Sequence, residues 1–358
     1  MGCQLKGLDL YTIKRVSAGA YLSMIDKVSK EAGLSPFLDS LWMKSWSDLS
    51  PGVALYCVSV DGECVGGFGV SEQTVFKYGI RLCQLFLHRH GSEKYDQVWI
   101  EENDVISLPK YTSIVWSALF KVFTDSKADE LFVGLSYPIE SIESCSYESV
   151  IEIESTTYGR TLGDHIRDFD SLLACFSRNT RSQLKRAVKK LPDVVSLDRA
   201  ENLPHALKML GWAAEHHKKK WSDSGFLNPS FFEFHKRLIS EGLVDGKVEL
   251  MQFSVGSRVA AVYYYFLQDK SVYFYLGAVN YNDFDDKLKV GLLAHCYAMV
   301  HFAGLGFEKY DFLAGEARYK ASLSDIQTQQ YMYVLSKPSM KQKLIKALKS
   351  IKQIITRN

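Results

Sequence analysis

Residues 309–320 read KYDFLAGEARYK, and this stretch indicates how the second half of the chain folds. Its first part is apolar and aromatic, as in a buried strand, and an Ala-Gly bend follows. Asp311 and Glu316 bracket that bend, where side chains are commonly presented to a cleft. Tyr319 and Lys320 follow Glu316 at the spacing of one helical turn. The stretch therefore predicts a strand and bend that present Glu316, Tyr319 and Lys320 to a pocket.

The elements expected around this stretch have the same order as those in the first half of the chain. In each half two helices precede a hairpin, a further strand, a helix and a last strand. The first half is expected to contain helices 18–32 and 37–46, a hairpin of 55–60 with 64–70, strand 78–87, helix 111–124 and strand 130–134. The second half is expected to contain helices 203–220 and 229–241, a hairpin of 248–255 with 259–267, strand 272–279, helix 290–303 and strand 308–312. Duplication of one α/β unit explains this recurrence better than coincidence.

The length of 358 residues suits two domains, each large enough to bury its own core. Gly159 and Gly163 interrupt the pattern within 156–167, so the boundary is expected there. The predicted domains are 1–165 and 166–335, and a helical tail, 336–358, follows them. The fold class is α/β.

The net charge of +2 conceals an asymmetry along the chain. The tail carries seven Lys and Arg and no acid, so the remaining residues hold 36 basic against 41 acidic side chains. This balance argues against a general nucleic-acid-binding surface and favours a local contact with an anion. The apolar residues of the tail recur at helical period, with lysines between them. Such a helix either docks on its own domain or lies on anionic lipid.

A second basic segment, residues 178–190, reads RNTRSQLKRAVKK and contains six basic residues and no acid. Arg178, Arg181, Lys185 and Lys189 share one face of the expected helix. Two interpretations remain open: a solvated surface helix, or a contact with phosphate.

Motifs of several catalytic classes are missing from the sequence. There is no dinucleotide-binding glycine motif opening a helix after a strand, no phosphate-binding P-loop and no nucleophile elbow. His88 with His90, and His216 with His217, lack partners at metal-site spacing, so no metal is expected. Transfer between two bound substrates remains open, because it needs positioning and a proton acceptor but no such motif.

Several short motifs of the second half occur in the order typical of a known family. They are LxxxFSRNTRSQLKR ending at Arg186, HKKKW from His217, YxYLGA from Tyr273, GLL from Gly291, and YDFLAGE from Tyr310 with Tyr319-Lys320 after it. This succession resembles the GNAT-like acyltransferases of the CelD (cellulose-biosynthesis) type. These are relatives of the FemAB peptidoglycan-bridge aminoacyltransferases, which carry two GNAT-like domains in tandem. The resemblance covers roughly 169–325, and the first half matches more loosely.

The resemblance implies two tandem GNAT-like domains with mixed, mostly antiparallel sheets flanked by helices. It implies an N-acyltransferase that takes acyl-CoA as co-substrate and acts on an amino group, often of a sugar or cell-envelope precursor. The family's pyrophosphate loop has two glycines, whereas the matching stretch here has one, Gly291. The residues expected at the donor phosphates are Lys287, Lys289, Gly291, Arg178 and Arg181. The single glycine leaves aminoacyl-tRNA open as the donor.

The candidates for catalysis follow from the need for a proton acceptor, since only the free amine attacks a thioester. Glu316 is the first choice for that base, and His217 is the alternative. Tyr319 is expected to donate to the tetrahedral oxyanion or the departing thiolate. Lys320 is expected to bind a phosphate or carboxylate, and Asp311 to orient the loop.

Three hypotheses for function therefore stand. The first is an acyl-CoA-dependent N-acyltransferase that acts by direct transfer on an amino-sugar or related polysaccharide precursor. The second is an aminoacyl-tRNA-dependent transferase, and the third is an inactive GNAT-like binding module. The expected location is cytoplasmic, at the inner face of the membrane if the tail 336–358 contacts anionic lipid.

Overall fold

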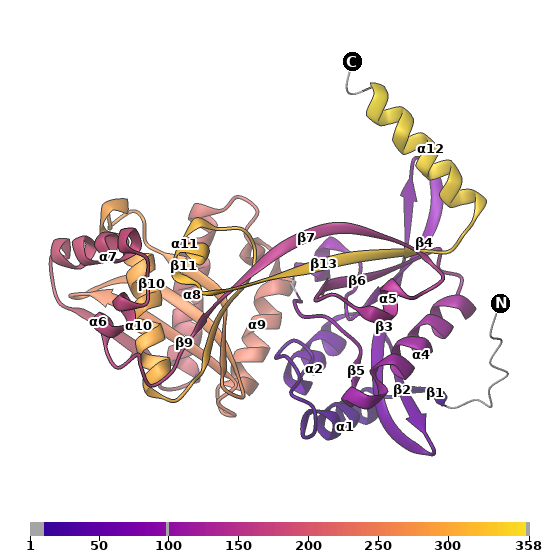
Figure 1. Ribbon diagram of the computed structural model, residues 1–358, viewed down its shortest axis with the longest axis horizontal. Coiled ribbons are helices and arrows are strands. Elements are labelled where there is room, and N and C mark those ends of the chain that lie inside the picture. The colour runs from indigo at the N-terminus through magenta and orange to yellow at the C-terminus, as the bar shows by residue number, and fades with distance from the viewer. Residues whose placement is uncertain (1–10, 98–99, 356–358) are drawn as a thin grey trace. The chain divides into compact units, whose positions relative to one another are not determined.

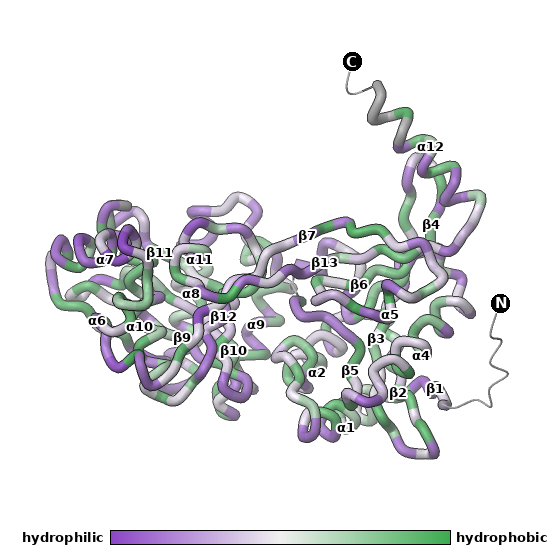
Figure 2. The backbone as a smooth tube through the Cα atoms, viewed as in Figure 1, coloured by the Kyte–Doolittle hydropathy of each residue, from purple (hydrophilic) through white to green (hydrophobic). Residues whose placement is uncertain are grey.

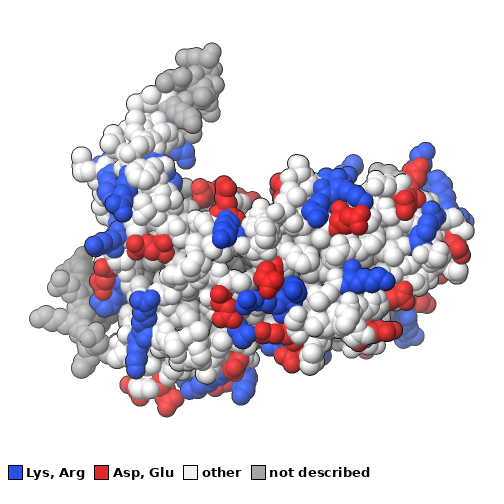
Figure 3. Space-filling view, turned by 180° about the vertical axis from the view of Figure 1, so that it is seen from behind, with Lys and Arg blue, Asp and Glu red and all other residues white. Residues whose placement is uncertain are grey.

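A computed structural model describes residues 11–97 and 100–355 of the chain. The chain divides into two compact units (Figure 1). Unit 1 comprises Met1–Glu154 and Gln330–Asn358, and unit 2 comprises Ser155–Gln329. Side chains of both signs are interspersed on the face seen in Figure 3.

Unit 1 contains a mostly antiparallel sheet with helices packed on it. Its strands are β1 (Thr12–Val16), β2 (Ala54–Val60), β3 (Glu63–Lys77), β4 (Ile80–Leu87), β5 (Ile106–Ser107), β6 (Glu130–Ser136), the first part of β7 (Glu148–Thr161) and most of β13 (Ile326–Ser336). Its helices are α1 (Ala18–Ser29), α2 (Ser40–Leu49), α3 (Glu93–Asp96), the short 3-10 helix η1 (Pro109–Tyr111), α4 (Thr112–Asp125), α5 (Glu140–Glu143) and α12 (Met340–Ile355). The strand order is β1-β2-β3-β4-β6-β13, and within it only β4 and β6 pair in parallel.

Unit 2 repeats this plan. Its strands are the end of β7, β8 (Val195–Arg199), β9 (Val248–Val255), β10 (Arg258–Gln268), β11 (Ser271–Val279), β12 (Lys309–Ala314) and the start of β13. Its helices are α6 (Phe169–Ala174), α7 (Arg178–Lys190), α8 (Leu203–Lys220), η2 (Gly225–Leu227), α9 (Pro229–Gly242), η3 (Asp286–Leu288), α10 (Val290–Gly304) and α11 (Arg318–Leu323). The order is β7-β12-β11-β10-β9-β8, and here β11 and β12 form the parallel pair.

The recurrence predicted from the sequence is therefore present in the structure. In each unit two helices precede a hairpin and a third strand, and a helix then leads to a strand that pairs in parallel with the third. The first hairpin turns at Asp61 and Gly62, whose φ angles of 51° and 82° suit the turn that Asp-Gly favours. The prediction of an α/β fold with mostly antiparallel sheets is confirmed.

The units differ from the predicted domains at their boundaries. The expected boundary at 165/166 lies beyond strand β7, which runs from Glu148 through the segment read as a linker. The tail 336–358 is not separate, because Gln330–Asn358 belongs to unit 1. Pairing of β13 with β6 joins segments about 200 residues apart, and a local sequence pattern does not reveal such a pairing.

Each unit has its own hydrophobic core between sheet and helices. In unit 1 the core includes Phe68 and Leu131 from the sheet and Trp116 from α4. In unit 2, Tyr265 and Phe302 lie at its centre. Hydrophobic stretches run along the strands of both units (Figure 2). Among the described residues, none of the helices combines the length and apolar content that crossing a bilayer requires.

Candidate active site

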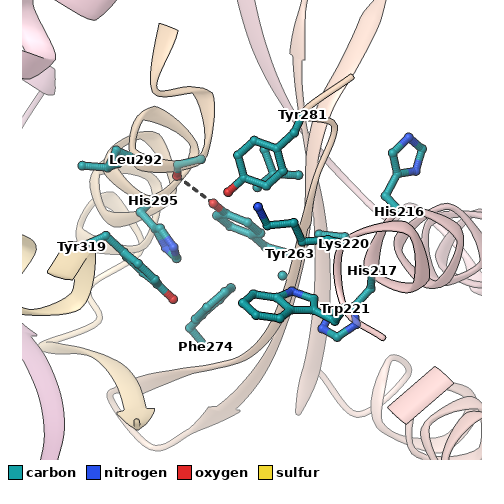
Figure 4. Close-up of a pocket in the computed structure, with 14 residues that line it drawn as sticks. His216, His217, Lys220, Trp221, Tyr263, Phe274, Tyr281, Leu292, His295 and Tyr319 are labelled. Atoms are coloured by element: carbon teal, nitrogen blue, oxygen red, sulfur yellow. Dashed lines mark hydrogen bonds between the residues drawn. The ribbon is translucent and has the colours of Figure 1, made fainter. Parts of the chain in front are cut away.

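A cavity of about 190 Å³ lies in unit 2, and five elements contribute to its wall (Figure 4). They are the C-terminal end of α8, the strand β10, the second half of β11, the start of α10 and the helix α11. The lining residues are His216, His217, Lys220, Trp221, Tyr263, Phe274, Gly277, Ala278, Val279, Tyr281, Gly291, Leu292, His295 and Tyr319. The wall is mostly aromatic, with histidines and one lysine as its charged or titratable nitrogen groups.

The cavity lies where the pairing of the two parallel strands ends. Strands β11 and β12 pair over only three positions, from Ser271 with Lys309 to Tyr273 with Asp311. The rest of β11 continues without that partner, and Phe274 and Gly277 from this part line the cavity. The fold itself therefore opens a binding site at this point of the sheet.

The N-terminus of α10 reaches the cavity wall through Gly291 and Leu292. Its first backbone N–H groups have no acceptor within the helix, and they carry the positive end of the helix dipole. A Cβ on Gly291 would lie 3.2 Å from Cγ2 of Val279 and 3.4 Å from Oη of Tyr263. The Tyr263 hydroxyl donates to the Gly291 carbonyl at 2.7 Å. The glycine thus lets the helix end pack tightly against the sheet, where its N–H groups can bind an anion.

His217, at the end of α8, was predicted as an alternative base, and the structure places it in the cavity wall. Its Nδ1 lies 2.8 Å from Oγ of Ser224, which is buried. Burial lowers the pKa of His217, and the nearby Asp223 carboxylate partly offsets that effect. The imidazole is therefore neutral at pH 7 and can accept a proton. The adjacent His216 instead stacks on Trp212, with ring centroids 3.8 Å apart.

His295 also faces the cavity, and the sequence analysis did not identify it. Its Nδ1 lies 2.8 Å from the hydroxyl of Tyr310, and that hydroxyl donates its own proton to Tyr265 at 3.2 Å. Burial, with a smaller contribution from the Lys320 charge, lowers the pKa of His295 to about 3. The neutral ring therefore donates from Nδ1 to Tyr310 and keeps Nε2 unprotonated. The only sequence signal was its position, one helical turn after Gly291.

Tyr319, a predicted hydroxyl donor, lies on α11 and lines the same cavity. Its ring stacks on that of His295, with centroids 5.2 Å apart and planes at 16°. Burial raises the pKa of Tyr319, so the phenol keeps its proton and can donate it in a hydrogen bond. On the opposite wall the Lys220 Nζ lies 4.7 Å from the centre of the Tyr281 ring.

Asp311, Glu316 and Lys320 lie near the cavity but are not among its lining residues. Asp311 is buried; it pairs with Lys309 Nζ at 2.7 Å and accepts from the Leu313 N–H at 2.7 Å. Leu313 has a φ of 62°, so this bond holds an unusual backbone conformation at the end of β12. Lys320 Nζ donates to the carbonyls of Leu313 and Ala314, at 3.3 and 2.5 Å. Glu316 is exposed on the bend, and its role as the base stays a prediction.

The predicted phosphate-binding residues outside the cavity lie on α7 and around η3. Helix α7 packs against η3, which contains Lys287, and against α10, which Lys289 directly precedes. The predicted phosphate-binding residues of α7 therefore lie on the same part of unit 2 as these two lysines. An open groove along α7 has only basic side chains and one serine in its wall. These residues are Arg178, Arg181, Ser182, Lys185, Arg186 and Lys189. Two of the arginines also bond to backbone: Arg181 donates to the carbonyls of Ala174 and Phe176, and Arg186 donates to the carbonyl of Ser182.

The His, Cys, Asp and Glu side chains of residues 11–97 and 100–355 form no group of three or more that could hold a metal ion. The cavity itself presents aromatic rings, imidazoles and the backbone N–H groups of a helix end.

Comparison with known protein families matches residues 178–321 to the family described as Acetyltransferase (GNAT) domain. The matched stretch contains the cavity and the whole of α7, β9 to β12 and α10. This stretch therefore matches a GNAT acetyltransferase domain, and the prediction of an acyltransferase enzyme is confirmed. A comparison with curated protein sequences finds no match.

Solved structures with a similar fold cover both units. The crystal structure of FemX is 12% identical, covers 94% of this chain and 99% of its own, and has a TM-score of 0.59. The C-terminal DUF2156 domain of a putative lysylphosphatidylglycerol synthetase from Agrobacterium fabrum is 9% identical, with coverages of 94% and 97% and a TM-score of 0.55. A conserved protein of unknown function from Bacteroides thetaiotaomicron is 10% identical, with coverages of 91% and 99% and a TM-score of 0.54. At these identities the likeness concerns the fold.

Proposed function

We propose that the protein is an N-acyltransferase of the CelD type that transfers an acyl group from acyl-CoA to an amino group of a sugar or cell-envelope precursor. The observation that carries this proposal is the composition of one cavity. An anion-binding helix end, an uncharged imidazole and a phenol all reach the same aromatic space. Direct transfer between two bound substrates needs these three kinds of group.

The donor is proposed to enter where β11 and β12 cease to pair. The N-terminus of α10 suits a pyrophosphate, because its free N–H groups and dipole attract negative charge. Gly291 allows the ligand to approach the backbone, and the row of cations on α7 supplies charge for further phosphates. The aromatic wall formed by Phe274, Tyr263 and Trp221 suits the uncharged chain that carries the thioester.

The chemistry requires one bond to form and one to break. The nitrogen lone pair of the acceptor amine attacks the thioester carbonyl carbon, and the carbon–sulfur bond then breaks. In the proposed mechanism His217 takes the proton that leaves the nitrogen. Tyr319 donates its proton to the departing thiolate and regains one from the protonated imidazole through solvent. The products are an amide and free CoA, and the enzyme returns to its initial state.

Binding of CoA thioesters tests the donor half of the proposal. Acetyl-CoA or a longer acyl-CoA is expected to raise the melting temperature of the full chain. Gly291→Ala should weaken that binding about tenfold, equivalent to about 1.4 kcal/mol, because the added Cβ crowds the helix end. Gly304→Ala is the matched control: it lies in the same helix, and a Cβ there meets nothing within 4 Å. If no acyl-CoA shifts the melting temperature, the acyl-CoA proposal fails.

A second candidate, transfer from aminoacyl-tRNA, is favoured by the uncompensated row of cations on α7. Its groove would follow the phosphates of an RNA backbone. Under this alternative, Lys185→Glu with Lys189→Glu should abolish tRNA binding in a filter assay. Under the acyl-CoA proposal the same variant should instead weaken acyl-CoA binding. Binding of acyl-CoA without turnover of any amine would instead support the inactive binding module.

A further inference from the structure

Unit 1 exposes large hydrophobic side chains on three of its elements. Among the described residues, these elements are the tip of the β3–β4 hairpin, the start of β7 and helix α12. The residues are Phe76, Tyr78, Val150, Ile151, Ile153, Met340, Leu344 and Ile351. Single exposed apolar residues are common on protein surfaces, whereas a group of them usually marks an interaction surface.

Helix α12 presents two different faces. Gln342 and Ile345 are buried against unit 1, so the helix is docked on its own unit. Met340, Leu344 and Ile351 are 79%, 52% and 52% exposed. At about 100° per residue these three side chains lie within about 40° of one another, on the side away from the docked face. Hydrophilic and hydrophobic residues accordingly alternate around the helix (Figure 2). Docking alone therefore does not account for the apolar residues of this helix.

The hairpin tip and the helix are held together by one buried carboxylate. Glu130 accepts from Lys77 Nζ at 3.2 Å through Oε2 and from Gln342 Nε2 at 3.0 Å through Oε1. Lys77 is the last residue of β3, and its neighbours Phe76 and Tyr78 are 70% and 46% exposed. The hairpin tip and the first turns of α12 therefore form one surface (Figure 1).

The charges around this surface indicate the chemistry of its partner. Residues 336–358 contain seven Lys and Arg and no acid. Viewed down the axis of α12, Lys341 lies on one side of the apolar stripe and Lys343 on the other. Both lysines are exposed. Three acids of unit 1 contact α12: Asp129, Glu130 and Glu148. Asp129 and Glu148 pair with Lys341 and Lys346, and Glu130 is bonded to Lys77 and Gln342.

Beyond these pairs, the first part of β7 carries the exposed acids Glu152 and Glu154 next to its apolar residues. That strand therefore does not suit a negatively charged partner, and the surface is limited to α12 and the hairpin tip. A basic helix with an apolar stripe, beside an exposed phenylalanine and tyrosine, matches the chemistry of an anionic lipid interface.

We propose that α12 and the β3–β4 hairpin tip form a surface that binds anionic lipid headgroups, with the stripe of Met340, Leu344 and Ile351 entering the interface. Phe76 and Tyr78 supply a second anchor. This inference does not depend on the proposed catalytic activity, which belongs to unit 2. It would hold the enzyme at a membrane, within reach of an acceptor carried on a lipid.

Co-sedimentation with vesicles tests the proposal on the full chain. Wild type is expected to sediment with vesicles of phosphatidylglycerol and phosphatidylcholine, and to remain in the supernatant with phosphatidylcholine alone. Met340→Ser, Leu344→Ser and Ile351→Ser together should lower the partition coefficient about 100-fold or more, because three apolar side chains lose their burial. Lys343→Gln should lower it about fivefold. Phe76→Ser should also weaken binding.

The matched control replaces two valines of unit 2, Val194→Ser with Val244→Ser, which are 82% and 86% exposed. That variant should bind vesicles as wild type does. Equal sedimentation of wild type and the α12 triple variant would overturn the proposal, as would a wild type that ignores anionic vesicles. Concentration-dependent dimerisation that the triple variant abolishes would assign the stripe to a second copy instead.

Discussion

Replacing His217 with glutamine is expected to lower kcat by about 10²- to 10⁴-fold, the usual contribution of a general base. His217 lines the cavity, and its lowered pKa keeps it unprotonated at neutral pH. Because a histidine pKa is ordinarily near 6.5, wild-type activity should fall only as the pH drops below that value. The variant, which lacks the imidazole, should not show this fall in activity at acidic pH. Steady-state rates measured between pH 5 and pH 8 on both proteins provide the test.

His216→Gln is the control for this experiment, because His216 is the next residue and also borders the cavity, but it stacks on Trp212. Its rate is expected to stay within about threefold of wild type. Glu316→Gln separates the two candidate bases. If Glu316→Gln removes the activity and His217→Gln does not, the proton acceptor is the carboxylate on the bend.

The sequence predicted those features of the site that depend on local patterns. Gly291, His217 and Tyr319 come from three separate motifs, and the structure brings them into one cavity. His295 escaped detection because α10 is apolar around most of its circumference, with nine buried positions. In such a helix no periodic pattern distinguishes the side that faces a cavity from the side that faces the core.

Long-range pairing accounts for what the sequence did not reveal about the fold. Strands β7 and β13 each contribute residues to both compact units. Within unit 2, Arg160 near the end of β7 pairs at 3.2 Å with Asp325, the residue before β13. These residues are 165 positions apart. The exposed and polar residues of β7 resemble a linker when read alone, because the strand has little burial along its first half. The position of the domain boundary could therefore not be predicted from the amino-acid composition of this segment.

Acidification from pH 7.5 to pH 5 is expected to destabilise the protein strongly, because three histidines are buried in their neutral form. Burial lowers the pKa of His88 to about 4 and those of His235 and His295 to about 3. In the unfolded chain each would titrate near 6.5, so below that pH the unfolded state binds protons that the native state does not. Stability is therefore lost as the pH falls from 6.5 towards 3 to 4.

The expected loss at pH 5 is about 2 kcal/mol for each histidine, or roughly 4 kcal/mol in unit 2 and 2 kcal/mol in unit 1. Such a loss is a large part of the stability of a typical domain, which is about 5 to 15 kcal/mol. Denaturant unfolding across this pH range measures it. His235→Phe, within a cluster of aromatic rings, should reduce the loss in unit 2 by about 2 kcal/mol, since one of its strongly shifted titrations disappears. His165→Gln, at an exposed site, is the control for the loss of a histidine and should leave the stability at pH 7.5 unchanged. A His235→Phe variant as acid-sensitive as wild type would show that other groups cause the acid lability.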